Sequence, residues 1–205
     1  MRLVPLLVTF PLLAAPLAAQ NLERPADWKV RFDQPAPDTA IYFVSMPPGW
    51  HITTGPAAIL YDPEQHAEGE YRVESEVNLF PGERREGFGV FVGGNHLDGA
   101  DQSYLYFLIR KDGNYLIKRR TGNDTETIVP WTPHDAIVKH DGGEGTVKNA
   151  LAIQCDSDQV RFFVNNSEVK SLPRAALDVD GVVGLRVNHR LNIHVSSLEV
   201  TPVGG

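Results

Sequence analysis

Apolar and polar residues alternate with a period of two along most of the chain. Between residues 71 and 80 the odd positions hold Tyr, Val, Ser, Val and Leu, and the even positions hold Arg, Glu, Glu, Asn and Phe. This period is typical of a β-strand with one buried face, not of a helix. The same rhythm returns in residues 88–92, 104–110, 115–119, 151–155, 160–164 and 193–200. No stretch keeps an apolar period of 3.6, so the pattern predicts an all-β protein with almost no α-helix.

Turn residues separate these runs at the short spacing that is typical of a β-sandwich. The segment Lys111–Asn114 contains Asp-Gly, which favours a tight hairpin turn. A second hairpin is predicted around Asp156–Gln159. The pattern predicts polar or irregular connections at 63–69 and 123–147, and one helical turn at 173–177.

The alternation also predicts which side chains form the core. We expect the following apolar residues to be buried between the sheets: Val73, Val77, Phe88, Val90, Leu105, Phe107, Leu151, Ile153, Phe162, Leu185, Val187 and Ile193.

The N-terminus has the features of a secretory signal peptide. Arg2 precedes an apolar stretch at 3–13, and several alanines follow it. We expect cleavage after Ala19, which leaves 20–205 as a single domain of secreted or periplasmic location. Cys155 is the only cysteine, so no internal disulfide is expected, and its position in the alternation indicates a small core residue.

The charge of the chain argues against several classes of partner. There are 26 acidic and 19 basic residues, for a formal net charge of −7, and no basic run. Such a chain is a poor binder of nucleic acids and of anionic membranes. After the signal peptide, no apolar stretch is long enough to span a bilayer. We expect a monomer with no nucleic-acid partner and no membrane span.

Five segments resemble motifs of a known superfamily when they are taken in order along the chain. They are Trp50–Ile52 with Gly55 and Ala58–Tyr61, then Tyr71–Val77, Gly87–Phe91, Val160–Asn165 and Gly181–Val187. Together they resemble the concanavalin A-like lectin/glucanase jelly roll. The resemblance is strongest to laminin-G-like and keto-disaccharide-hydrolase-like secreted bacterial domains. It implies an antiparallel two-sheet β-sandwich and a carbohydrate or cell-surface glycan as partner. This fold hosts lectins, hydrolases and inert spacers, so the activity remains open.

Glu74 and Glu76 are the candidate catalytic residues. They lie two apart on one predicted strand and therefore share a face. Laminarinase-like hydrolases, which the chain resembles here, place their catalytic carboxylates on one strand as E-x-D-x-E, and a retaining mechanism needs carboxyls about 5–5.5 Å apart. Asn78 stands where the last carboxylate of that pattern would be. The alternative is a polar strand face on which the glutamates pair with Arg72 or Arg186.

A second set of polar residues predicts a sugar-binding face. Arg186 and Asn188 share a face of one strand, and His194 lies on the polar face of the next. If that face also carries Arg72, Glu74, Glu76 and Asn78, it forms a cleft for sugar hydroxyls, with Tyr104 and Tyr106 as an aromatic platform. The alternative is that both tyrosines pack in the core with their hydroxyls at its edge.

The sequence predicts no cofactor and no metal-binding motif. The seven histidines include no H-x-H or H-E-x-x-H pattern. A structural calcium ion is the one metal left open, at Asp98 with Asp101 or at Asp178 with Asp180.

These observations predict a secreted carbohydrate-binding or surface-interaction module, with Asn78 favouring binding over catalysis. The alternatives are a glycoside hydrolase that uses Glu74 and Glu76, and a purely structural exported domain.

Overall fold

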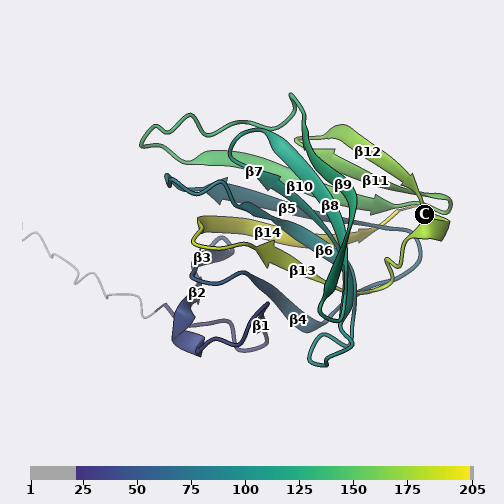
Figure 1. Ribbon diagram of the computed structural model, residues 1–205, viewed down its shortest axis with the longest axis horizontal. Helices are drawn as coiled ribbons and strands as arrows, with labels where there is room; N and C mark the ends of the chain where they lie inside the picture. The colour runs from purple at the N-terminus through teal and green to yellow at the C-terminus, as the bar shows by residue number, and fades with distance from the viewer. Residues whose placement is uncertain (1–21, 204–205) are drawn as a thin grey trace, which may run out of the picture.

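The computed structural model describes residues 22–203, and the predicted signal peptide at 1–19 lies outside these residues. The chain forms two antiparallel sheets of seven strands that pack face to face as a β-sandwich (Figure 1). Apart from strands, the described residues contain two short 3-10 turns, η1 (Asp38–Ala40) and η2 (Arg174–Ala176). The predicted fold class is therefore confirmed, and η2 falls within the predicted helical turn.

Each sheet combines hairpins of consecutive strands with pairs of strands that are distant in sequence, as in a jelly roll. Sheet A has the order β1 (Lys29–Phe32), β4 (Ala58–Ala67), β13 (Gly181–Val187), β6 (Gly87–Asn95), β7 (Ser103–Arg110), β8 (Asn114–Thr121) and β9 (Asp124–Pro133). Sheet B has the order β12 (Ser167–Pro173), β11 (Gln159–Val164), β10 (Val147–Cys155), β5 (Tyr71–Leu79), β14 (Asn192–Pro202), β3 (Trp50–Thr54) and β2 (Ile41–Ser45).

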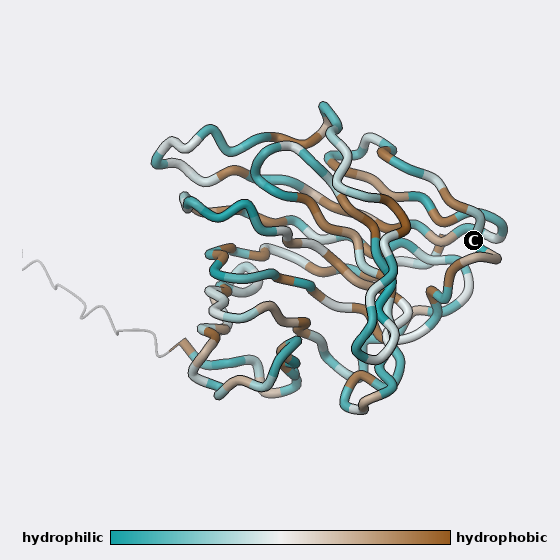
Figure 2. Tube along the Cα trace, in the orientation of Figure 1, coloured by the Kyte–Doolittle hydropathy of each residue, from teal (hydrophilic) through white to brown (hydrophobic). Residues whose placement is uncertain are grey.

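The main core lies between the two sheets, and hydrophobic residues concentrate in the strands while the loops are mostly hydrophilic (Figure 2). All twelve side chains that the alternation predicts to be buried belong to this core. Cys155 is also fully buried there, as expected. Burial raises the pKa of its thiol to about 11, so the thiol stays protonated and unreactive at neutral pH.

The outer face of sheet A is apolar as well, in contrast to the polar outer face of sheet B. A second cluster covers it and consists of Ile59, Tyr61, Phe91, Leu97, Tyr104, Tyr106, Leu108, Leu116 and Val182, with Trp131 packed against them. The outward positions of β5 in sheet B are Arg, Glu, Glu and Asn, and all are partly exposed. The two outer faces therefore offer different chemistry to a ligand.

Two segments that the sequence predicts to be irregular are strands. β4 continues to Ala67, through the predicted polar loop, and β9 occupies much of the region 123–147. Pro63 lies where the pairing of β4 with β13 shifts register, so its missing N–H costs no ladder hydrogen bond. Pro130 lies at a similar shift in β9, which is the edge strand of sheet A.

No helix among residues 22–203 has the length and apolar character needed to cross a membrane.

Candidate functional site

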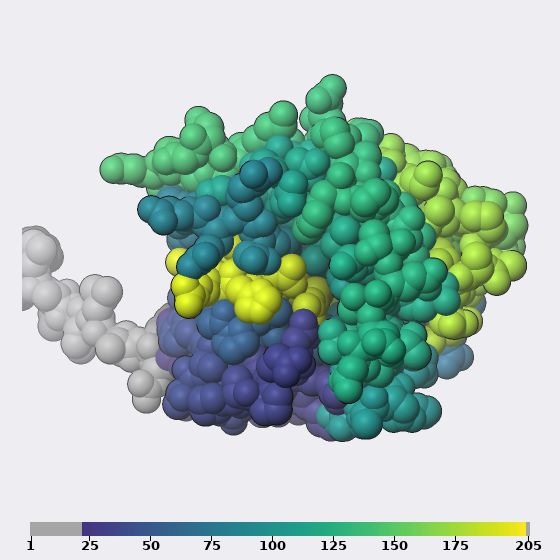
Figure 3. All heavy atoms as spheres, viewed as in Figure 1, coloured from purple at the N-terminus to yellow at the C-terminus, as the bar shows by residue number. Residues whose placement is uncertain are grey.

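A groove of about 560 Å³ lies on the outer face of sheet A. Its floor includes Tyr106, Leu108 and Leu116 from the second apolar cluster, and Trp131 of β9 also lines it. The purple N-terminal segment, the green β8–β9 region and the yellow C-terminal strands meet in the middle of the face shown in Figure 3. The volume is in the range of about 300–1,000 Å³ that is usual for ligand pockets.

Two glycines make room for the aromatic rings on this face. A Cβ at Gly87 would lie 2.8 Å from Cη2 of Trp131, and one at Gly184 would lie 2.5 Å from Cε1 of Phe91. Any larger residue at these positions would push the rings off the sheet. On Trp131, the guanidinium carbon of Arg110 lies 4.4 Å from the ring centroid, a cation–π contact that helps to fix the ring.

Arg186 is the centre of the polar part of the groove. Its two terminal nitrogens each donate to one carboxylate oxygen of Asp33, both at 2.6 Å. It also donates to Oδ1 of Asn188 at 3.1 Å and to the hydroxyl of Tyr104 at 3.3 Å. Its guanidinium carbon lies 5.5 Å from the Tyr106 ring centroid. Because Arg186 is only 5% exposed, these contacts hold it rigidly in place.

Arg120 is a second buried cation beside the same carboxylate. It is 6% exposed, and its Nε donates to the Gly122 carbonyl at 3.1 Å. Its Nη1 lies 3.6 Å from Oδ1 of Asp33, which is too far for a hydrogen bond. Asp33 therefore faces two guanidinium groups and bonds closely to one of them.

The two guanidinium groups control the ionisation of Asp33. Burial alone would raise the pKa of Asp33, but the hydrogen bond from Arg186 and the charges of Arg186 and Arg120 outweigh it and hold the pKa below its ordinary value of 3.8. Burial raises the pKa of Tyr106 to about 12 and also raises that of Tyr104. At neutral pH the groove therefore contains an ionised Asp33 and two neutral phenols.

The structure separates the predicted ligand-binding residues into two groups. Tyr104, Tyr106, Arg186 and Asn188 lie together on the outer face of sheet A. Tyr104 does not line the groove, and both tyrosines are buried, so they pack in an apolar cluster as the alternative had it and do not form an open platform. Arg72, Glu74, Glu76, Asn78 and His194 lie on the outer face of sheet B. The reason is that β13 and β5 belong to different sheets, so the single cleft that would combine both groups does not form.

The sheet B group consists of paired and partly exposed side chains. Arg72 bonds Glu74 at 2.6 Å, and Lys148 bonds Glu76 at 2.9 Å. Nδ2 of Asn78 donates to the Ser196 hydroxyl at 3.2 Å, and Nε2 of His194 contacts the Pro48 carbonyl at 2.8 Å. The glutamates therefore each have a cationic partner on an open strand face, and Arg186 pairs with neither of them.

Of the groove residues, the sequence predicted Tyr106, Arg186 and Asn188, and it missed the others that the argument uses, Asp33, Lys118, Arg120 and Trp131 among them. For the two cations, the alternation of Lys118 and Arg120 with Ile117 and Arg119 gave a signal, because it places both on one strand face.

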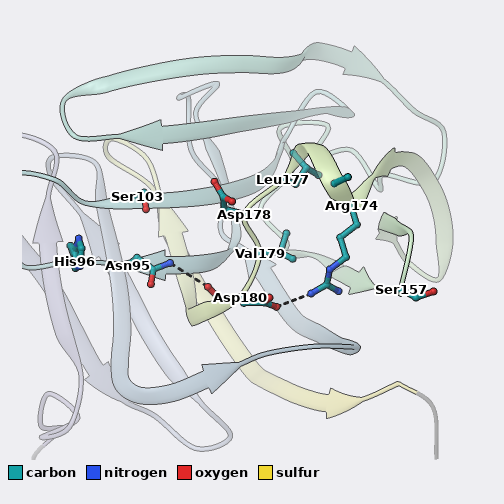
Figure 4. A pocket seen from close by; sticks show the side chains of 10 residues that line it. Asn95, His96, Ser103, Ser157, Arg174, Leu177, Asp178, Val179 and Asp180 are labelled. Atoms are coloured by element: carbon teal, nitrogen blue, oxygen red, sulfur yellow. Dashed lines mark hydrogen bonds and ion pairs between the residues drawn. The ribbon is translucent and has the colours of Figure 1, made fainter.

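A second hollow of about 580 Å³ lies between the β6–β7 connection and residues 174–180 (Figure 4). Its polar groups bond mainly one another. Arg174 bonds Oδ1 of Asp180 at 2.8 Å and the Gly69 carbonyl at 2.7 Å, and Asn95 donates to the Asp180 carbonyl at 3.2 Å. These hydrogen bonds hold the loops together. They leave fewer free polar groups for a ligand than the groove on sheet A has.

The calcium expectation concerns the same end of the molecule. Asp98 pairs with Lys29, and Asp101 pairs with His96. Within residues 22–203, no three His, Cys, Asp or Glu side chains gather as a metal-binding group. The calcium site stays a prediction.

Comparison with known proteins identifies the fold. No family model and no curated protein matches the chain. Among solved structures, the carbohydrate-binding module CBM66 of Bacillus subtilis aligns with a TM-score of 0.62 at 10% identity, covering 88% of this chain and 96% of that one. A Bacteroides ovatus GH16 in complex with a mixed-linkage glucan product gives 0.61 at 7% identity, with 88% and 97% covered. The luminal domain of VIP36 in its Ca²⁺/mannose-bound form gives 0.58 at 6% identity, with 87% and 84% covered. The chain has the concanavalin A-like jelly-roll fold, as its sequence motifs predicted.

Proposed function

We propose that this chain is a non-catalytic carbohydrate-binding module whose site is the groove on sheet A. The observation that carries the proposal is a groove that combines the partly exposed ring of Trp131 with the fixed polar groups of Arg186 and Asn188, while Tyr106, which is only 5% exposed, supports its floor. Sugars present apolar ring faces that pack on aromatic side chains, and hydroxyls that need donors and acceptors at their edge. The same fold in a carbohydrate-binding module, and in structures with a glucan product and with mannose bound, supports this choice.

Asp33 and the two glutamates predicted from the sequence argue for binding rather than hydrolysis. A glycoside hydrolase needs a carboxylic acid that is protonated near neutral pH to assist the leaving group. Asp33 has both oxygens bonded to Arg186 and a lowered pKa, so it is a poor proton donor. Glu74 and Glu76, the candidates from the sequence, are ion-paired on the opposite outer face.

The Trp131→Ala variant tests the location of the site. We expect it to weaken binding of a glycan identified on an array by about 10-fold or more, because a large stacking surface is lost. Isothermal titration calorimetry measures the change. The matched control is Phe163→Ala, because Phe163 also packs under an arginine, Arg72 at 4.8 Å, but on the outer face of sheet B. We expect this control to bind as the wild type does.

Other outcomes would favour the alternatives. Hydrolysis of a β-glucan by the wild type that disappears in Glu74→Gln or Glu76→Gln would favour a hydrolase with its site on sheet B. Binding that is lost in Phe163→Ala but retained in Trp131→Ala would also move the site to sheet B. Absence of binding to every arrayed glycan would leave the structural-domain interpretation.

We also propose that the protein acts outside the cytoplasm, on the basis of Arg2 and the apolar stretch at 3–13. Expression of the full chain in a bacterial host should give periplasmic or extracellular protein whose intact mass corresponds to a start at Gln20 or Asn21. Recovery of protein that keeps Met1 in the cytoplasmic fraction would contradict export.

A further inference from the structure

The groove on sheet A has a formal charge opposite to that of the whole chain. Four basic side chains line it, Arg85, Lys118, Arg120 and Arg186, against two acidic ones, Asp33 and Glu86. The formal excess is therefore two positive charges, in a chain whose net charge is −7. A local charge of opposite sign in a concave site concentrates ligands of the complementary charge.

Ion pairing accounts for two of the four basic side chains and leaves Lys118 and Arg120 against Glu86, a formal excess of one positive charge. Arg186 is neutralised by Asp33, and Arg85 pairs at 2.5 Å with Asp112, a carboxylate outside the groove. Lys118 has no ion-pair or hydrogen-bond partner among residues 22–203. Arg120 shares Asp33 with Arg186 and is the more distant of the two guanidiniums.

The protein leaves these cations only partly compensated, although one of them is buried. A buried charge is costly unless it is paired and hydrogen-bonded, and one carboxylate cannot balance two guanidiniums. The neighbouring phenols of Tyr104 and Tyr106 supply no negative charge, since burial raises their pKa values and keeps both protonated at neutral pH. An anionic group on a ligand would supply the missing charge.

The β7–β8 register places the cations beside the aromatic floor. Lys118 is the cross-strand partner of Tyr106, and Arg120 is the cross-strand partner of Tyr104. Directly opposite side chains on one face lie about 5 Å apart at their Cβ atoms. A sugar in the groove above Tyr106 would therefore have its substituents within reach of Lys118.

We propose that the groove binds acidic sugars, whose carboxylate or sulfate group is received by Lys118 and Arg120 while the ring packs on the partly exposed Trp131. This inference rests on the proposed sugar binding at the same groove and names its ligand class. Arg120 supplies planar donors and Lys118 a point charge, a combination that suits either oxyanion. A hollow of about 720 Å³ that contains Arg31 continues the groove past Asp33 and Asn123, which line both, so an oligosaccharide has room to extend.

The test compares acidic polysaccharides with their neutral partners. The probes are polygalacturonate and alginate against their methyl esters, and dextran sulfate against dextran, titrated calorimetrically into the purified protein in 50 and 500 mM NaCl. We expect at least one acidic member to bind about 10-fold or more tightly than its neutral partner at low salt. The difference should shrink at high salt, because exposed charges are screened. The pair that shows the preference distinguishes a carboxylate from a sulfate.

Two lysine variants separate a local contact from general attraction. Lys118→Met keeps the length of the side chain and removes its charge, and we expect it to lose about 10-fold in affinity for the acidic probe. Lys148→Met makes the same charge change on sheet B, where Lys148 pairs with Glu76, and we expect no loss. Equal losses in both variants would overturn the proposal by showing non-specific attraction.

The remaining outcomes overturn the inference in ways that can be told apart from failure of the proposed function. Equal affinity for acidic and neutral partners, with binding that Trp131→Ala weakens, would leave a sugar-binding groove without acidic preference. No binding of any probe or arrayed glycan would overturn both proposals.

Discussion

Phe162→Ala is expected to lower the free energy of unfolding by about 3–5 kcal/mol. Phe162 lies on the inner face of β11, is fully buried, and its ring centroid is 5.4 Å from that of Phe107 in sheet A. The ring therefore contacts the opposite sheet across the core. Truncation removes its buried apolar surface and leaves a cavity that two stiff sheets cannot fill.

The adjacent phenylalanine supplies the control for this prediction. Phe163 points to the outer face, is half-buried, and lies under Arg72 and Arg161. Phe163→Ala should cost about 1 kcal/mol, the usual size for an exposed cation–π contact. Denaturant titrations of both variants with unchanged m values would measure the difference. A loss under 1 kcal/mol for Phe162→Ala would mean that the register of β11 is inverted, because a one-residue slip exchanges the faces.

The inner face of the sandwich could be predicted from sequence because it follows one physical rule. In β5 the buried and partly exposed positions alternate without interruption, so Val73 and Val77 could be assigned to the core directly. In β7 the rule is weaker, since six consecutive residues are buried. There Tyr104 and Tyr106 face outward and Leu105 and Phe107 face inward, and both sets are apolar.

The strands that the sequence missed contain prolines. Pro63 in β4 and Pro130 in β9 usually indicate loops, but both lie at shifts of register where a ladder hydrogen bond is already absent. Because the sequence did not predict β9, it also did not predict that Trp131, which lies in this strand, belongs to the groove. The β-branched run at 127–129 was the signal that could have indicated this strand.

The candidate site was only half predictable because alternation assigns a residue to a face but not to a sheet. Arg186 and Asn188 share a face as expected, and their side chains are hydrogen-bonded. Whether that face also carries Glu74 depends on strand order, which long connections determine and local pattern does not. The pairing of Arg186 with Asp33 joins residues 153 positions apart, a contact that no local signal indicates.

This pairing gives the groove both its rigidity and its dependence on one carboxylate. Asp33 is the only carboxylate within 4 Å of Arg186 or Arg120 among residues 22–203. Arg186 stays protonated although it is buried. Burial alone would lower its pKa, but the hydrogen bonds and charge of Asp33 outweigh burial and raise the pKa further above the physiological range. The positions of the two buried guanidinium groups near Tyr106 therefore depend on Asp33.

Asp33→Asn should accordingly lower the free energy of unfolding at pH 7 by about 3 kcal/mol, because it leaves two buried guanidiniums without a counter-charge. The expected cost is at the lower end for a buried pair, since the Asp33 side chain is 25% exposed and water can reach it. Denaturant titration measures the loss. The matched control is Glu76→Gln, which removes the carboxylate of an exposed pair with Lys148 and should cost under about 1 kcal/mol.

The pH dependence of the difference between the wild type and Asp33→Asn identifies its cause. The folded pKa of Asp33 is depressed, so its charge stabilises the fold above the unfolded value and this stabilisation is lost as the pH falls through the folded pKa. The difference in free energy of unfolding between the wild type and Asp33→Asn should therefore be largest at pH 7. It should shrink progressively below pH 3.8, the ordinary pKa of an aspartate. A gap under 1 kcal/mol at pH 7, or one that stays constant as the pH falls, would show that the ion pair does not hold the groove together. If the groove receives an acidic sugar, the same ligand should restore part of the lost stability in Asp33→Asn, because its anionic group would replace the missing charge.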